Sequence, residues 1–478
     1  MRRITDLVFD NSYARLHPAF YEVVNPAPLP DPYLVAFSPA AASLLDLDHS
    51  QADNPDLPAY LGGERRLPGS EPIAQVYAGH QFGVWVPRLG DGRAFLLGEV
   101  GNGRGESWDL HLKGGGQTAF SRGGDGRSVL RSAVREYLCS EAMNGLGIPT
   151  TRALAIAGSD FPVLRETTET AATLLRLSPS HVRFGTFEYF AARGEVGRLR
   201  DLAAYVVGRH FPETAGAANR HAAFLGEVVR RTAHLVAAWM AAGFCHGVLN
   251  TDNMSVLGIT LDYGPFGFLD DFDAGHVCNH SDTEGRYAYD QQPAIGLWNL
   301  ARFAEALLPL MPETAARDAL DGYRVEFAAE YGRLMRAKLG LILEHPGDAE
   351  LVRDLLMLLQ ASRVDYTGFF RELGTERGAS PGGAGHEGWQ AWRRRYEARL
   401  AAEPSRARGA EMSRVNPRYV LRNWIAQEAI EHAQRKEFGR IEEIRRVLAA
   451  PFDEHPDFER YAEPPSTAAG EIAVSCSS

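Results

Sequence analysis

Residues 246–253, His-Gly-Val-Leu-Asn-Thr-Asp-Asn, combine residue types that could serve phosphate transfer, and an Asp-Tyr-Gly sequence begins shortly afterwards at Asp262. Kinase-like phosphotransferases use a His-x-Asp-x-x-x-x-Asn loop followed by Asp-Phe-Gly, in which the Asn and the second Asp hold the metal and the first Asp is the base. His246 and Asn253 have that spacing. Because Mg²⁺ prefers oxygen ligands, we predict that Asn253 and Asp262 bind the metal.

The position of the expected base holds Val248, which cannot accept a proton, and the nearest carboxylate in the loop is that of Asp252. Three interpretations therefore remain open from the residues alone. Asp252 assists γ-phosphoryl transfer in an ordinary phosphotransferase, the displaced carboxylate serves a different transfer, or the protein is a nucleotide-binding scaffold without catalysis.

Lys113 and Glu136 are the residue types that form the lysine–glutamate pair of kinase-like nucleotide sites. Only three of the 50 basic residues are lysine, namely Lys113, Lys338 and Lys436. Lysine is a compact point charge and arginine a planar fork, so the two are not interchangeable at a tight site. The alternative is a solvated strand end and an ordinary exposed helix residue, and the rarity of lysine favours the pair.

Two glycine-bearing turns could offer backbone N–H groups to phosphate, although either could equally be a plain hairpin turn. They contain Gly90, Gly92 and Arg93 in one case and Asp125 and Gly126 in the other. Arg176 and Arg183 could clamp a polyphosphate, because a guanidinium binds phosphate through two hydrogen bonds. Either arginine alone would more often be a surface residue.

Several other chemistries are excluded by missing motifs. The chain has no Gly-x-x-x-x-Gly-Lys-Ser/Thr, Gly-x-Ser-x-Gly or His-Glu-x-x-His sequence, which argues against a P-loop NTPase, a common serine hydrolase and a zinc peptidase. Residues 271–280 are rich in Asp and His, but their spacing fits no zinc pattern. The four cysteines form no Cys-x-x-Cys pair, so neither a disulfide scaffold nor a structural zinc site is expected.

Composition predicts a globular protein. Of 478 residues, 45% are hydrophobic and 23% charged, and the net charge of −11 comes without a basic run, so nucleic acid is not an expected partner. Fourteen of the 48 glycines fall within residues 79–126, which indicates turns that approach a ligand closely. The start of the chain lacks a signal-peptide pattern, and its longest apolar stretch is too short for a membrane span. We therefore expect a cytoplasmic protein without a membrane partner.

The elements that position these residues are predicted from periodicity. Strands are expected at 84–87, 94–100 and 108–112, and alternation puts Leu110 and Leu112 on one face of the last strand and Asp109, His111 and Lys113 on the other. A helix at 128–144 contains Glu136, and further strands are expected at 152–157, 163–167 and 173–177. From about residue 186 the chain is predicted to be helical, at 224–242, 298–310, 314–340, 349–359, 420–434 and 440–449. Residues 25–32 read as extended chain and 372–388 as a loop.

Four strings in this chain resemble the selenoprotein O family, whose members are pseudokinases that act as protein adenylyltransferases. They are residues 77–83, Tyr-Ala-Gly-His-Gln-Phe-Gly; residues 112–118, Leu-Lys-Gly-Gly-Gly-Gln-Thr; residues 246–255; and residues 416–424. The resemblance spans nearly the whole chain and includes a cysteine followed by two serines at its end. It implies transfer of AMP from ATP to Ser, Thr or Tyr of target proteins, with ATP flipped so that its α-phosphate is presented. UMP transfer with Mn²⁺ is also associated with some members.

The resemblance also assigns roles to residues of this chain. Lys113, paired with Glu136, would contact phosphate, and Asp252 would be the base. Asn253 and Asp262 would bind Mg²⁺ or Mn²⁺. Arg176 and Arg183 would hold the buried end of the triphosphate, and Gly90, Gly92, Arg93, Asp125 and Gly126 would line the nucleotide site. Cys476 stands where many members carry selenocysteine, which suggests a redox-active residue that could pair with Cys278.

These inferences combine into an α+β, protein-kinase-like bilobed fold, expected to be monomeric. Its parts are an N-terminal extension at 1–65, a strand-rich nucleotide-binding lobe at 66–185, a mostly helical lobe with the catalytic and metal loop at 186–463, and a flexible tail at 464–478 that carries Cys476. A conventional γ-phosphate kinase and a non-catalytic ATP-binding pseudokinase remain the alternatives.

Overall fold

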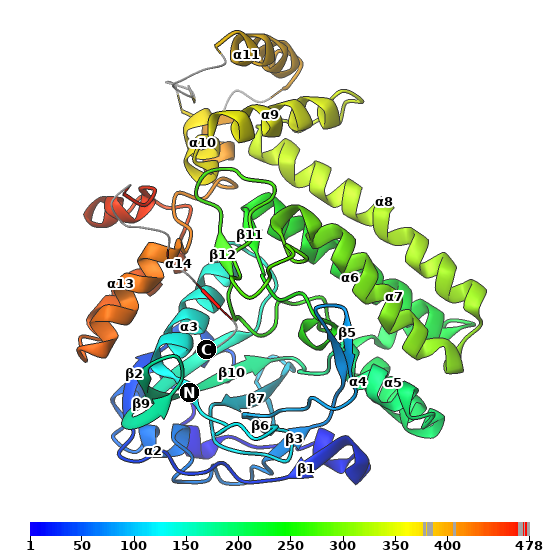
Figure 1. Ribbon diagram of the computed structural model, residues 1–478, viewed down its shortest axis with the longest axis vertical. Coiled ribbons are helices and arrows are strands. Elements are labelled where there is room, and N and C mark those ends of the chain that lie inside the picture. The colour runs from blue at the N-terminus through cyan, green and yellow to red at the C-terminus, as the bar shows by residue number, and fades with distance from the viewer. Residues whose placement is uncertain (376–378, 380–385, 405–407, 467–471, 473, 476–478) are drawn as a thin grey trace.

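The computed structural model describes residues 1–375, 379, 386–404, 408–466, 472, 474 and 475. Within them the chain mixes α-helices with β-strands. Most of the strands lie in the lower part of Figure 1, and the long helices α6 (Arg220–Ala242), α7 (Gln292–Leu307) and α8 (Glu313–Lys338) lie above them and to the right.

Eight strands of the described chain form one antiparallel sheet in the order β1-β3-β6-β7-β10-β9-β2, with β8 paired to β10 beside this path. Two smaller sheets pair β4 with β5 and β11 with β12. The strands are β1 (Tyr21–Val23), β2 (Tyr33–Phe37), β3 (Ile73–Gln75), β4 (Gly79–Gln81), β5 (Val84–Val86), β6 (Ala94–Gly101), β7 (Ser107–Lys113), β8 (Ser128–Val129), β9 (Arg152–Leu164), β10 (Thr168–Ser178), β11 (Phe244–Cys245) and β12 (Gly267–Phe268).

One face of the large sheet is covered by the first part of the chain. Leu110 and Leu112 of β7 pack there in a cluster with Ile4, Leu45 and Leu61. The same N-terminal segment supplies the edge strands β1 and β2. Alternation along β7 therefore leaves the side chains between the two leucines for the opposite face, as the sequence predicts.

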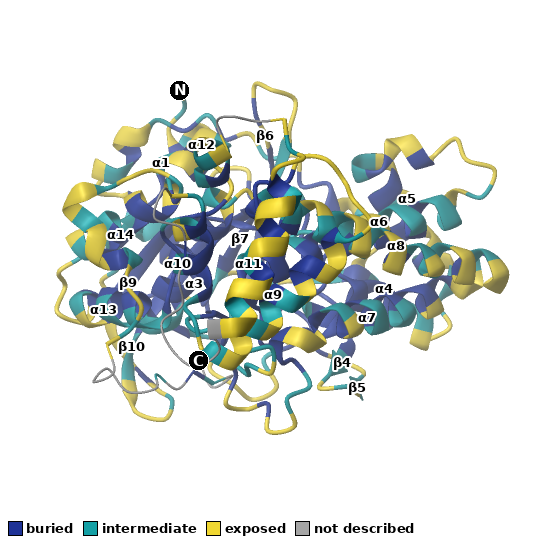
Figure 2. Ribbon diagram, turned by 90° about the horizontal axis from the view of Figure 1, so that it is seen from above, coloured by how far each residue is buried: buried dark blue, intermediate teal, exposed yellow. Residues whose placement is uncertain are grey.

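The opposite face of the sheet packs against helix α3 (Leu130–Gly145), which also contacts β9, β10, α13 and α14. Figure 2 shows α3 and β7 as largely buried, whereas α9 carries exposed residues along its outer side. The remaining helices are α1 (Pro39–Ser43), α2 (Leu57–Leu61), α4 (Phe184–Ala192), α5 (Val196–His210), α9 (Asp348–Ser362), α10 (Tyr366–Leu373), α11 (His386–Leu400), α12 (Arg408–Ser413), α13 (Asn423–Gln434) and α14 (Gly439–Ala449).

Two local predictions are wrong. The expected separate strands at 152–157 and 163–167 are one strand, β9, which turns at 165–167 into β10. Residues 160–162 fall in the expected gap and are exposed, but they continue the strand, and Pro162 pairs with Thr170 of β10. The expected loop at 372–388 also contains the end of α10 and the start of α11, while residues 376–378 and 380–385 lie outside the described part.

Among the helices in the described part of the chain, none has both the length and the apolar character that a membrane crossing requires.

Candidate active site

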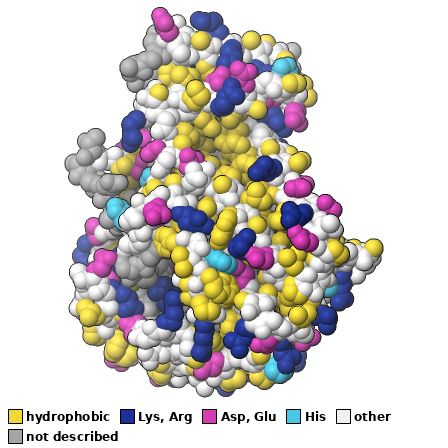
Figure 3. Space-filling model, turned by 45° about the vertical axis from the view of Figure 1, so that its right-hand side comes forward, with side chains coloured by type: hydrophobic (Ala, Val, Ile, Leu, Met, Phe, Trp, Pro, Cys, Tyr) yellow, Lys and Arg dark blue, Asp and Glu magenta, His cyan; other side chains and the backbone are white. Residues whose placement is uncertain are grey.

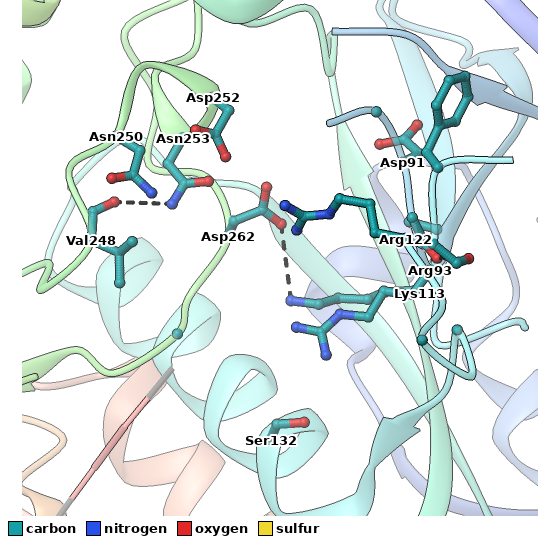
Figure 4. Close-up of a pocket in the computed structure, with 18 of the residues that line it drawn as sticks. Asp91, Arg93, Lys113, Arg122, Ser132, Val248, Asn250, Asp252, Asn253 and Asp262 are labelled. Carbon is teal, nitrogen blue, oxygen red and sulfur yellow. Dashed lines mark hydrogen bonds and ion pairs between the residues drawn. The ribbon is translucent and has the colours of Figure 1, made fainter. Parts of the chain in front are cut away.

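A cavity of about 550 Å³ collects nearly every residue that the sequence singled out. Figure 4 shows Asp252, Asn253 and Asp262 on loops of the helical part, facing Lys113 and Arg93 from the strand-rich part. The predicted residues that line the cavity are Gly90, Gly92, Arg93, Lys113, Asp125, Gly126, Arg176, Arg183, Asp252, Asn253 and Asp262.

Lys113 stands at the end of β7, on the sheet face opposite Leu110 and Leu112. Its Nζ lies 2.6 Å from Oε2 of Glu136, which α3 carries across the sheet. Glu136 is 2% exposed, so it is not an ordinary surface residue of the helix. Alternation along β7 points the Lys113 side chain toward the face of the sheet that α3 covers, and Glu136 lies on the side of α3 that faces this sheet. The two side chains therefore meet.

Arg176 joins this pair to the metal-ligand candidate. It lies on β10 opposite His111 of β7, and its guanidinium contacts Glu136 at 2.9 Å, Asp262, and Nδ1 of His111 at 2.8 Å. The side chain is 2% exposed. Arg176 is thus a buried structural connector, contrary to what a lone arginine in so arginine-rich a chain suggests.

Asp262 accepts hydrogen bonds from two buried arginines, Arg176 and Arg183, the latter at 2.7 Å. Burial alone raises the pKa of the Asp262 carboxyl, but Arg176, Arg183 and Lys113 together outweigh it and hold that pKa well below its usual range. Asp262 also adopts a left-handed backbone conformation, with φ +54°. Such conformations in non-glycine residues concentrate at functional sites. The carboxylate is therefore fixed in place and ionised.

Asp252 has different surroundings. Its Oδ2 accepts a hydrogen bond of 3.1 Å from Nε2 of Gln81, while its buried Oδ1 has no hydrogen-bond partner among the described residues. Burial raises the pKa of Asp252 to about 6, partly offset by the Gln81 hydrogen bond and by Arg183. A carboxylate with this pKa is ionised near pH 7 and is a better proton acceptor than an ordinary aspartate.

The residues present fit a divalent metal. Nδ2 of Asn253 donates to the carbonyl of Val248 at 2.9 Å, which leaves the amide oxygen as the group available to a ligand. Figure 4 places Asn253 between Asp252 and Asp262. An amide oxygen and an ionised carboxylate are hard donors suited to Mg²⁺ or Mn²⁺. Among the described residues no cluster of three or more His, Cys, Asp or Glu forms a metal site, so the two ligands would need nucleotide phosphate oxygens to complete the shell.

The glycine turns form the strand-side wall of the cavity. Gly90 has φ +70°, and a Cβ added there would lie 2.3 Å from the ring of Phe120. Gly126 has φ +68°, and its added Cβ would lie 2.1 Å from the backbone of Gly116. Asp125 pairs with Arg165 at 2.7 Å and accepts from the backbone N–H of Arg127. Glycine is therefore required at both positions beyond its role in turns, by the Phe120 ring at Gly90 and by the Gly116 backbone at Gly126.

Three contributors to the site were not assigned a role from the sequence. Gln81 lies within a string that the family resemblance uses, but nothing in its spacing indicated a bond to Asp252. Arg165 supports Asp125 from the end of the β9–β10 hairpin. His111 faces the site by alternation, accepts from Arg176 and lies 3.3 Å from Asp91, a pairing that only the sheet register reveals.

Cys278 is 5% exposed, and its Sγ is 2.9 Å from the carbonyl of Pro265, a residue that lines the cavity. Burial raises the pKa of its thiol. The predicted partner Cys476 lies outside the described residues, although the nearby backbone N–H of His280 donates to the carbonyl of Val474 at 2.9 Å. The redox pairing stays a prediction.

A family model and several known proteins that resemble this chain are all described as nucleotidyltransferases. The family model described as "Protein adenylyltransferase SelO" matches residues 3–448. The chain is 57% identical over 490 residues to the protein nucleotidyltransferase YdiU of Myxococcus xanthus, 53% over 492 residues to that of Thioalkalivibrio sulfidiphilus and 50% over 487 residues to that of Azotobacter vinelandii. Each match covers 100% of both chains.

Proposed function

The chain belongs to the protein adenylyltransferase SelO family, and from this premise we propose how its cavity moves AMP from ATP onto Ser, Thr or Tyr hydroxyls of target proteins. As a protein nucleotidyltransferase it takes a nucleotide and a protein as substrates. We place ATP in the cavity with its α-phosphate toward Asp252. Mg²⁺ or Mn²⁺ would be held by Asn253 and Asp262, and UMP transfer with Mn²⁺ belongs to the same proposal.

The observation that carries this proposal is the pair of carboxylates in one cavity with different surroundings. Asp252, with a pKa of about 6 and no basic group bonded to it, suits proton transfer. Asp262, held ionised by arginines, suits metal binding. The position two residues after His246, where kinase-like sites carry the base, holds Val248. Asp252 is therefore the candidate base in this loop.

The reaction then proceeds as one displacement. The acceptor oxygen attacks the α-phosphorus as Asp252 takes the hydroxyl proton, and the bond from the α-phosphorus to the bridging oxygen breaks. Pyrophosphate carries away the bond electrons. The metal, when bound, supplies positive charge that favours pyrophosphate departure.

Each cation of the cavity has a proposed place on the nucleotide. Lys113, positioned by Glu136, contacts phosphate. Arg176 and Arg183, which are both buried and line the cavity, hold the far end of the triphosphate. Both also donate to Asp262, so they would bind phosphate and this carboxylate at the same time. Nucleotide contacts of the strand-side wall come from Gly90, Gly92, Arg93, Asp125 and Gly126.

At the level of architecture we propose the bilobed arrangement of a kinase-like fold. Residues 66–185 would form the nucleotide-binding lobe and 186–463 the helical lobe, with 1–65 and 464–478 as extensions. The position of the cavity between β7 and β10 on one side and the loops at 248–265 on the other supports this division.

A labelling experiment tests the proposal. The protein is incubated with a soluble protein extract and ATP labelled at either the α- or the γ-phosphate, with Asp262→Ala as the inactive control. Adenylylation predicts that proteins are labelled from the α-position only. Labelling from the γ-position only would establish a kinase, and labelling from neither would refute transfer to proteins.

A further inference from the structure

The hairpin of β4 and β5 lies at the rim of the cavity and is separate from the large sheet. Gly79 pairs with Val86 and Gln81 with Val84, which leaves Phe82 and Gly83 as a two-residue turn. Gln81 and Phe82 line the cavity. The turn thus reaches the place where a protein substrate must approach Asp252.

Three successive residues of this hairpin are bonded to the loop that carries Asp252. The absence of a side chain at Gly79 permits the close approach, since a Cβ there would lie 2.8 Å from Oδ1 of Asp252. The bonds run from His80 N to Thr251 Oγ1 at 2.7 Å, from Gln81 Nε2 to Asp252 Oδ2 at 3.1 Å, and from Phe82 N to Asn250 Oδ1 at 3.1 Å. Hairpin and catalytic loop therefore form one connected unit.

Phe82 occupies a turn position that does not favour it. Phe82 and Gly83 both have positive φ, +49° and +79°, which is the pattern of a type I′ turn. Such turns favour Asn-Gly, because a bulky side chain is strained at positive φ. The turn geometry therefore does not explain a phenylalanine here, and strained residues of this kind concentrate at functional sites.

The side chains at the hairpin tip are apolar and accessible. Phe82 is 37% and Val84 67% exposed, and one side of the Phe82 ring packs on Tyr287 at a centroid distance of 5.2 Å. On the face shown in Figure 3, hydrophobic side chains run through the middle with Lys and Arg on either side. Phe82 lines the cavity and is partly exposed, so its ring offers an apolar contact there.

We propose that the hairpin tip, Phe82 and Val84, is the docking surface for the protein substrate. It binds an extended segment in which an apolar side chain neighbours the acceptor hydroxyl, so that the hydroxyl is held at Asp252. The inference rests on the proposed function, because it names what the second substrate contacts. The continuity of the tip with the Asp252 loop selects this occupant over a second copy of the chain.

The central test compares wild-type protein with Phe82→Asn, which suits the turn and removes the ring. The readouts are the melting temperature, the dissociation constant of ATP, and the initial rate of labelling of a soluble protein extract from α-labelled ATP at several extract concentrations. We expect an unchanged or higher melting temperature, ATP affinity within twofold, and a labelling rate at least tenfold lower at low extract concentration. Equal labelling rates would overturn the proposal, as would a loss of rate matched by a loss of ATP affinity.

Phe161→Asn is the matched control. Phe161 is 43% exposed on β9 and does not line the cavity, so the same substitution there should leave the labelling rate unchanged. An equal loss of rate in this control would also overturn the proposal. The wild-type arm separates this inference from the proposed function, because wild-type protein that labels nothing refutes adenylylation itself.

Synthetic peptides test the chemistry of the occupant. Two peptides with a single serine differ only in whether leucine or alanine flanks it. The leucine peptide should inhibit extract labelling by wild-type protein at least tenfold more strongly than the alanine peptide, and Phe82→Asn should abolish the difference. Equal inhibition of wild-type protein by both peptides would refute the apolar contact.

Discussion

Asp252 and Asp262 line the same cavity, but Asp262 accepts hydrogen bonds from two buried arginines whereas Asp252 accepts one from the amide of Gln81. Arginine pairing holds the pKa of Asp262 low despite burial, and burial raises the pKa of Asp252 to about 6. Pairs of carboxylates whose pKa values are pushed apart are typical of sites that divide acid–base and electrostatic roles. The difference predicts distinct phenotypes for the two residues.

Replacing Asp252 with alanine should lower AMP transfer about 10²- to 10⁴-fold, the usual contribution of a general base. ATP affinity should stay within about twofold, because no cation is hydrogen-bonded to this carboxylate and Arg183 keeps its bond to the backbone carbonyl of residue 252. Transfer is measured with α-labelled ATP and affinity by titration calorimetry. Asp271→Ala is the matched control, since Asp271 pairs with Arg363 away from the cavity. Parallel loss of affinity and transfer in Asp252→Ala would contradict its assignment as base.

Asp262→Asn should instead impair both nucleotide binding and folding. Arg183, which is 1% exposed, would lose its ion-pair partner, and leaving a buried charge without its partner costs about 3 kcal/mol or more. We expect a lower free energy of unfolding without nucleotide, and ATP affinity that no longer responds to Mg²⁺. Chemical denaturation and ATP titrations with and without Mg²⁺ measure the two effects. Undiminished Mg²⁺ dependence would exclude Asp262 as a metal ligand.

Lys113→Arg should weaken ATP binding although it keeps the positive charge. The Lys113 side chain is 12% exposed and its Nζ fits between Glu136 and Asp262 at 2.6 and 3.9 Å, a space suited to a point charge and not to a planar fork. We expect the dissociation constant of ATP to rise about tenfold. Lys436→Arg, at a lysine whose side chain is 54% exposed, should change nothing. Full ATP affinity in Lys113→Arg would refute a tight phosphate contact.

The sequence predicts the parts of this site that follow from local periodicity. Alternation along β7 correctly placed Lys113 and His111 opposite Leu110 and Leu112, and the helical pattern placed Glu136 on α3. These predictions succeed because each face of the sheet is buried against a different partner, so the pattern of side chains reflects the fold directly.

Other parts of the site depend on long-range packing that no local pattern records. Arg176 meets His111 only through the β10–β7 register, and Gln81 meets Asp252 across 171 residues of chain. Two strands were expected at 152–157 and 163–167, whereas β9 runs without a break through Pro162, which lies in its exposed part, where proline is tolerated. Sequence spacing thus singled out the loop at 246–253 but not the residues that hydrogen-bond to it.

Glu188, on helix α4 next to the β4–β5 hairpin, should make the stability of the protein depend on pH. Burial raises its pKa to about 7, and its Oε1 lies 2.7 Å from Nδ1 of His80. A carboxyl whose folded pKa is raised stabilises the fold below its unfolded pKa, near 4.5, and loses that contribution as pH rises through 7. Relative to Glu188→Gln, the wild-type free energy of unfolding should fall by about 3 kcal/mol between pH 4.5 and 8. Denaturation at several pH values measures the difference, and parallel curves would contradict it.

Gly126, which lines the cavity, and Gly123, three residues before it, separate the effect of backbone strain from that of a close backbone contact. Both have positive φ, +68° and +83°, so alanine costs about 1–2 kcal/mol of stability at either position. A Cβ at Gly123 meets nothing within 4 Å, but at Gly126 it would lie 2.1 Å from the Gly116 backbone. Gly126→Ala must therefore also displace the loop between β7 and β8, and we expect at least a tenfold loss of ATP affinity that Gly123→Ala does not show. Equal ATP dissociation constants for the two variants would mean that this loop does not shape the nucleotide site.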